Sequence, residues 1–116
     1  MVKETVLELI RDYLRVVNRF GIHANRAILY GSWAKGEAGS DSDIDLVVLA
    51  PEFDEQHDRD LVSQLWGLRV EIPEAWRIEP IACGEREWLE DDSRMIIEIA
   101  RQEGEMIDLE PEIASN

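Results

Sequence analysis

The chain has 116 residues, of which 26 are acidic and 12 are basic, giving a formal net charge of −14 at pH 7. This length supports one domain with a single hydrophobic core and is too short for a separate substrate domain. So acidic a surface repels phosphate backbones, which argues against direct binding of DNA or RNA and favours a basic partner.

The cysteine count and the apolar runs exclude further classes. Cys83 is the only cysteine, so an internal disulfide and a multi-cysteine zinc site are excluded, and its apolar surroundings predict a buried thiol. The N-terminus has no signal-peptide pattern, and no run approaches the ~20 apolar residues of a membrane helix. We therefore expect a cytoplasmic protein that does not enter the membrane.

The first half of the chain alternates between a helix and two strands. Apolar residues at helical spacing predict an amphipathic helix over residues 3–19, ended by Gly21. A short apolar run predicts a strand at 26–30, and a loop of small residues follows at 31–42. The second strand, expected at 43–50, is an almost continuous apolar run and should be buried on both faces.

The second half continues the alternation. An acidic cluster precedes the apolar segment 61–66, and we interpret it as a helix start rather than a metal site; its members are Asp54, Glu55, Asp58 and Asp60. A third strand is expected at 77–83. Asp91, Asp92 and Ser93 then offer N-cap residues for a helix that ends at Gly104. A last strand at 105–109 and a frayed end at 110–116 complete an α/β or α+β domain whose sheet is covered by helices.

The loop and the second strand carry the most specific pattern. Asp43 and Asp45 are two residues apart, so in a strand both side chains point to the same face. Two carboxylates that close repel each other by ~4 kcal/mol at an effective dielectric constant of ~20, which favours a divalent cation between them. The backbone N–H groups of the small-residue loop after Gly31 are able to face phosphates. Together these features predict chemistry on a nucleotide.

Two competing motifs fail on details. A Walker-type phosphate loop needs Gly-Lys followed by Ser or Thr, whereas Lys35 is followed by Gly36. A calcium loop beginning at Asp41 would need a glycine where Leu46 stands. Neither motif explains the segment.

The segment resembles a known signature. Gly31-Ser32, ten further residues and then Asp43-x-Asp45 are similar to the signature of nucleotidyltransferases of the DNA polymerase β superfamily. The flanking residues look like the minimal nucleotidyltransferase branch, which includes antitoxins. The resemblance spans residues 6–109 and implies one nucleotidyltransferase domain over 1–116, with a mixed β-sheet flanked by α-helices.

The resemblance also implies roles for individual residues. Gly31, Ser32 and Ser42 would bind the nucleotide, and Asp43 and Asp45 would be catalytic ligands of two Mg²⁺ ions. The family uses a third carboxylate on a later strand, which would be both a metal ligand and the general base. The acidic residue of the third predicted strand is Glu79, for which a structural salt bridge is the alternative. Its neighbour Pro80 belongs at a sheet edge or a bulge.

Two loop residues allow more than one interpretation. Trp33 stands where relatives often carry a basic residue, so a phosphate contact is either missing or replaced by stacking. Lys35 is a phosphate ligand or, more simply, a charge facing solvent.

The implied reaction is the transfer of AMP from ATP to a hydroxyl group, with release of pyrophosphate. The resemblance further implies a helical HEPN-family toxin as partner, with one of its tyrosines as acceptor and this protein as antitoxin. Two alternatives stay open. One is an antitoxin that neutralises its partner by binding alone, and the other is modification of a small molecule such as an aminoglycoside. A homo-oligomer or a hetero-oligomer is compatible with each.

Overall fold

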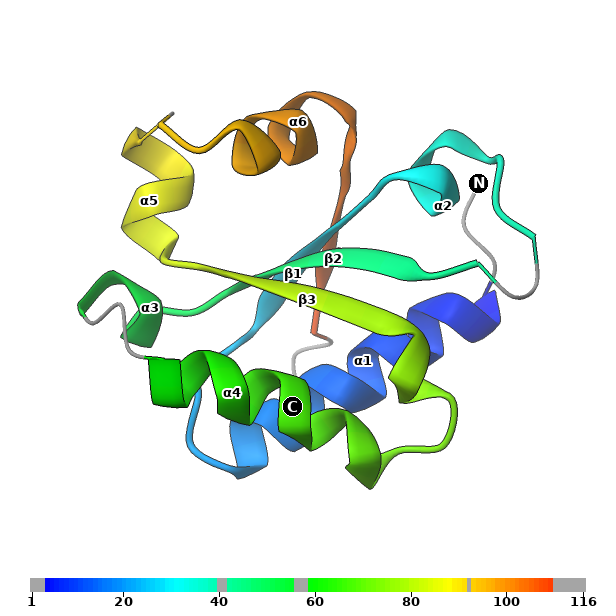
Figure 1. Ribbon diagram of the computed structural model, residues 1–116, viewed down its shortest axis with the longest axis horizontal. Coiled ribbons are helices and arrows are strands. Elements are labelled where there is room, and N and C mark those ends of the chain that lie inside the picture. The colour runs from blue at the N-terminus through cyan, green and yellow to red at the C-terminus, as the bar shows by residue number, and fades with distance from the viewer. Residues whose placement is uncertain (1–3, 40–41, 56–58, 92, 110–116) are drawn as a thin grey trace, which may run out of the picture.

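The described chain forms four strands, six α-helices and two 3₁₀ helices (Figure 1). The computed structural model describes residues 4–39, 42–55, 59–91 and 93–109. The strands are β1 (Arg26–Tyr30), β2 (Ile44–Leu49), β3 (Ile78–Cys83) and β4 (Glu105–Asp108). The α-helices are α1 (Glu4–Arg19), α2 (Ser32–Lys35), α3 (Glu52–Glu55), α4 (Arg59–Gly67), α5 (Glu85–Glu90) and α6 (Met95–Glu103). The 3₁₀ helices are η1 (Leu68–Glu71) and η2 (Ala75–Arg77).

The strands form one mixed sheet in the order β3-β2-β1-β4. β1 pairs with β2 and with β4 in antiparallel fashion, whereas β2 and β3 are parallel. β3 is therefore an edge strand. This position explains how Pro80, which lacks a backbone N–H, fits within a strand.

Helices cover both faces of the sheet (Figure 1). α1 and α4 lie against one face, and α5 and α6 lie on the other. Alternate residues of β2 point to the two sides. Leu46 joins the larger core with Tyr13 of α1, and Val47 joins the smaller core with Ile97 of α6. Every residue of β2 except Asp45 is buried, which confirms that this strand is covered on both faces.

The predicted helix–strand order and the mixed sheet are confirmed, with strand ends that agree within about one residue. Gly21 ends α1 with φ of 104°, where its N–H donates to the carbonyl of Asn18. Gly104 follows α6, and its N–H donates to the carbonyl of Ala100. Cys83 is buried, as its apolar surroundings predict.

Three short helices were not predicted. α2 interrupts the expected loop 31–42, and α3 and α5, with four and six residues, are too short for an apolar periodicity to reveal them. The prediction that the acidic cluster begins the helix over 61–66 is confirmed for Asp60, which lies in the first turn of α4, and is wrong for Asp54. Asp54 instead lies in α3, and its carboxylate accepts the backbone N–H groups of Arg86 and Glu87 at 2.9 and 3.1 Å. It caps the start of α5 from outside that helix.

The N-cap prediction for α6 is also wrong. The residue preceding the helix is Arg94, with no side-chain capping bond, and the Asp91 carboxylate accepts the N–H of Ser93 within the preceding turn. Asp58, Asp92 and the frayed segment expected at 110–116 lie outside the described residues. Within the described ranges, no helix combines the length and apolar character needed to cross a membrane.

Candidate active site

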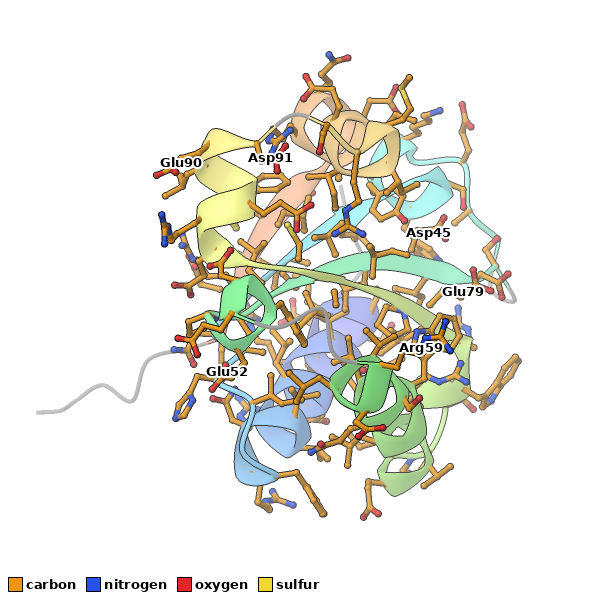
Figure 2. All side chains as sticks on the ribbon, turned by 60° about the vertical axis from the view of Figure 1, so that its left-hand side comes forward. Asp45, Glu52, Arg59, Glu79, Glu90 and Asp91 are labelled. Carbon is orange, nitrogen blue, oxygen red and sulfur yellow. The ribbon has the colours of Figure 1, made fainter. Side chains whose placement is uncertain are left out.

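The ends of three strands bring the predicted carboxylates together. Asp45, near the start of β2, is paired with Glu79 on β3 and with Tyr30 at the end of β1. Paired residues of neighbouring strands project from the same face of a sheet, so these three side chains share one face. Figure 2 shows Asp45 and Glu79 on adjacent strands at the same end of the sheet.

Asp43 completes the group from the residue preceding β2. Its carboxyl lies within hydrogen-bonding reach of the Glu79 carboxyl. Burial, followed by the charge of Asp43, raises the pKa of Asp45 above its usual value. Burial also raises the pKa of Glu79, with the charges of Asp43 and Asp45 next in size. The structure thus concentrates three mutually repelling acids at one partly exposed position.

Gly31 forms the wall beside Asp45. Its backbone has φ of 76° and ψ of −150°, a combination that is open to glycine and strained for other residues. A Cβ atom at this position would overlap the Oδ2 atom of Asp45. Glycine is therefore required both by the turn and by the close approach of the carboxylate.

The other two predicted nucleotide-binding residues differ in their placement. Ser32 is half-buried at the start of α2, directly after Gly31. Ser42 shapes the loop, because its hydroxyl accepts the N–H of Gly39 at 2.9 Å and its N–H donates to the Gly39 carbonyl. Ser32 thus directly follows the glycine that adjoins Asp45, whereas Ser42 closes the turn that leads to Asp43.

Trp33 is part of the protein core. Its ring is 6% exposed and packs in the larger core, so it is not available to stack on a nucleotide. The Arg77 guanidinium lies 5.7 Å from the ring centre, and its Nη2 donates to the carbonyl of Ser42 at 3.3 Å. Arg77 and Trp33 together fix the loop that precedes Asp43. Lys35 is half-exposed and its Nζ lies 3.7 Å from a carboxylate oxygen of Glu103.

Two arginines hold the segments that carry the site residues, and the sequence did not predict this role for either of them. Besides Arg77, Arg69 anchors the start of β3: its Nη1 donates to the carbonyls of Trp76 and Ile78 at 3.0 and 3.1 Å. The Arg69 guanidinium also lies 4.5 Å from the ring centre of Trp66. Its charge acts to lower the pKa of Glu79, although the acidic neighbours and burial outweigh it. Arg77 reaches Ser42 across 35 positions and Arg69 reaches Ile78 across 9, and neither contact follows a helix or strand period that the sequence would reveal.

The donor set is chemically suited to Mg²⁺. Carboxylate oxygens are the ligands that this ion prefers, and a divalent cation among these carboxylates would offset the repulsion that raises their pKa. As they stand, no three His, Cys, Asp or Glu side chains in the described ranges form a group that could hold a metal ion. The ligand types fit a magnesium site, and the side chains would have to reorient to surround the ion.

The comparisons agree with this fold. Residues 10–108 match the family model described as the nucleotidyltransferase domain, so the chain belongs to that family. A crystal structure of a Sulfolobus solfataricus protein, assigned as a nucleotidyltransferase, is similar with a TM-score of 0.50. The two chains are 24% identical, and the match covers 70% of this chain and 68% of the other. That likeness supports the fold. The search of curated proteins found no match.

Proposed function

We propose that this protein transfers AMP from ATP to a hydroxyl group and releases pyrophosphate. The observation that carries the proposal is the grouping of Asp43, Asp45 and Glu79 beside Gly31, in a chain of the nucleotidyltransferase domain family. Three carboxylates and an adjacent glycine turn suit the binding of a metal–triphosphate complex.

Each residue has a distinct role in this proposal. Asp43, Asp45 and Glu79 would hold Mg²⁺, whose positive charge would stabilise the negative charge that develops on the triphosphate. Gly31 allows a phosphate to approach the backbone, and Ser32 offers a backbone N–H and a hydroxyl group. Ser42 supports the same loop through its bonds to Gly39.

Glu79 would act as the general base. Glu79 shares the sheet face of Asp45, so its carboxylate lies where it could accept the proton of a hydroxyl group bound at that face. The acceptor oxygen forms a bond to the α-phosphorus while the bond from that phosphorus to pyrophosphate breaks. The hydroxyl proton goes to Glu79, and no covalent enzyme intermediate forms.

The acceptor in this proposal is a tyrosine of a HEPN-family toxin, which would make the protein an antitoxin. This part rests on the resemblance to minimal nucleotidyltransferases. The net charge of −14 supports it in one respect, since an acidic surface favours association with a basic RNA-cleaving partner. The net charge alone does not select the acceptor.

Intact mass spectrometry tests the reaction. The purified HEPN protein is incubated with this protein and MgATP, and a gain of one or more AMP units is expected. The gain should vanish with EDTA and in the Asp43→Ala/Asp45→Ala variant. A matched control is Glu4→Ala/Glu8→Ala, which removes two exposed carboxylates from α1 and should retain the activity.

The two alternatives give different results. A stable complex formed equally by wild type and Asp43→Ala/Asp45→Ala, without AMP transfer, would indicate an antitoxin that acts by binding. AMP transfer to an aminoglycoside but not to the protein partner would indicate a small-molecule nucleotidyltransferase.

A further inference from the structure

A groove of about 930 Å³ follows the free edge of β3. Its floor is Pro80, Ile81 and Ala82, and its walls come from α4 on one side and from α5 with the following segment on the other. The α4 wall presents one face of that helix, with residues at i, i+3, i+4 and i+7, namely Arg59, Val62, Ser63 and Trp66.

Three backbone positions at the edge of β3 do not offer a hydrogen bond to another strand. Pro80 has no backbone N–H, and the carbonyl of Ala82 accepts a bond from Arg94 Nη2 at 2.7 Å. The carbonyl of Ile78 accepts Arg69 Nη1 at 3.1 Å. Because these groups are occupied or missing, side chains rather than a backbone ladder must hold an occupant of the groove.

The charges in the groove are unevenly arranged. Arg59 and Arg86 line it and form no ion pair within the described part of the chain. Of the nearby acids, Asp54 caps α5, and Glu87 pairs with Arg94 at 2.7 Å. The starts of α4 and α5 therefore offer two cations to a ligand, in a chain whose net charge is −14.

The far end of the groove carries the opposite charge. Glu90 and Asp91 are both exposed and line the groove where α5 ends, apart from Arg59 in Figure 2. Arg86 is one helical turn from Glu90 on α5, so the cation that lies apart from these acids is Arg59 on α4, with Val62 next to it on the same helix face. A ligand that complements the groove would carry an acidic group for Arg59, an apolar group for Val62 and a basic group for Glu90 and Asp91. A polypeptide supplies these three kinds of side chain in one chain.

The groove adjoins the face that carries Glu79. Ile81 is two residues from Glu79 on the same strand, so the two side chains project from the same face, about 7 Å apart along the strand. An extended chain that runs along β3 with one residue against Ile81 therefore places the residue two positions further along at Glu79.

We propose that this groove binds an extended segment of the acceptor protein. The segment places a large apolar side chain against Val62, an acidic side chain at Arg59, and its hydroxyl-bearing residue at Glu79. The inference rests on the proposed function and specifies its acceptor as a polypeptide.

A displayed peptide library tests the groove without an identified partner. The probe is a set of 12-residue peptides with a fixed central tyrosine and random flanks, selected on the immobilised full chain without nucleotide. We expect enrichment of peptides with an acidic residue and a large apolar residue at fixed distances from the tyrosine. Absence of enrichment, or enrichment without this pattern, would overturn the proposal.

Matched variants locate the binding surface. Val62→Asp and Arg59→Glu should each weaken binding of an enriched peptide at least tenfold in isothermal titration calorimetry. Val70→Asp and Arg19→Glu make the same chemical changes at exposed positions that do not line the groove, and should leave the affinity unchanged. Equal binding by the wild type and both groove variants would show that peptides bind elsewhere, against the proposal.

The peptide-binding role of the groove and the proposed reaction can be disproved independently of each other. Asp43→Ala/Asp45→Ala should retain peptide binding, because neither residue lines the groove. An enriched peptide that binds through the groove but gains no AMP with MgATP would support the groove as a peptide site and contradict the proposed reaction. A tyrosine peptide modified equally well by Val62→Asp and Arg59→Glu would support the reaction and contradict the groove.

Discussion

Asp45 on β2 and Glu79 on β3 are paired residues of two parallel strands, and their side chains share the face at the open end of the sheet. The pairing joins positions 34 residues apart in the sequence. Burial and mutual repulsion raise the pKa of both carboxyls, so the fold holds an unfavourable cluster of charge. A divalent cation bound among these carboxylates would offset this repulsion.

Glu79→Gln should abolish most of the transfer activity. The amide cannot accept the acceptor's proton, so we expect kcat to fall by about 10²–10⁴-fold, the usual contribution of a general base. Steady-state kinetics with MgATP measures this. Glu71→Gln, an exposed position on η1, is the matched control and should retain wild-type kcat. Unchanged kcat in Glu79→Gln would assign this residue the alternative structural role.

Asp45→Asn should stabilise the protein in the absence of metal. Because the folded-state pKa of Asp45 is raised, the folded protein favours the protonated acid, and stability falls as pH rises from the unfolded-state pKa through the folded-state pKa. The amide removes this loss. We expect a higher melting temperature than wild type at pH 7 in EDTA, and a smaller difference at pH 3. A lower melting temperature at pH 7 would contradict this account.

With Mg²⁺ present, the wild-type protein should have a higher melting temperature than Asp45→Asn. An ion that binds only the folded state raises its stability by mass action, and Asp45→Asn would weaken this effect. Differential scanning fluorimetry with increasing MgCl₂ and ATP checks it. A wild-type melting temperature that does not respond to metal and nucleotide would contradict the proposed metal site.

Gly31→Ala should impair both folding and activity. The backbone angles at Gly31 strain any other residue by ~1–3 kcal/mol, and the new methyl group would displace the Asp45 carboxylate. We expect a lower melting temperature and at least a hundredfold loss of kcat/KM. Gly39→Ala is the control, since a Cβ atom there meets open space and its φ is not in the strained region. Equal behaviour of the two variants would refute the argument.

Asp54→Ala should destabilise α5 without touching the carboxylate site. The substitution removes the acceptor for the N–H groups of Arg86 and Glu87 and should cost about 1 kcal/mol, or roughly 5 °C in Tm. Hydrogen exchange should accelerate at these two amides. Glu55→Ala changes the adjacent exposed acid and should leave both properties near wild type.

The Cys83 thiol should be unreactive in the folded protein. Burial, followed by the charge of Glu87, raises the pKa of this thiol to about 12, so the reactive thiolate is scarce below that pH. Ellman's reagent at pH 8 should label Cys83 slowly in buffer and rapidly in guanidinium chloride. Rapid labelling of the native protein would contradict the buried position.

The sequence by itself determined the helix and strand order and the strongest part of the candidate site. These features are local. Apolar periodicity encodes α1, a continuous apolar run encodes β2, and the spacing from Gly31 to Asp45 lies within 15 residues. Glu79 was also proposed from the sequence, as the acidic residue of the third predicted strand. The tertiary structure explains why a proline fits next to it in that strand, because β3 lies at the edge of the sheet.

The tertiary structure alone decided which distant residues support the site. The bonds from Arg77 to Ser42, from Arg69 to Ile78 and from Asp54 to the start of α5 span 35, 9 and 32 positions. No periodicity marks such contacts, because each depends on how separate elements pack. The groove beside β3 has the same origin. Its walls come from helices on opposite faces of the sheet, and only folding brings them to one edge.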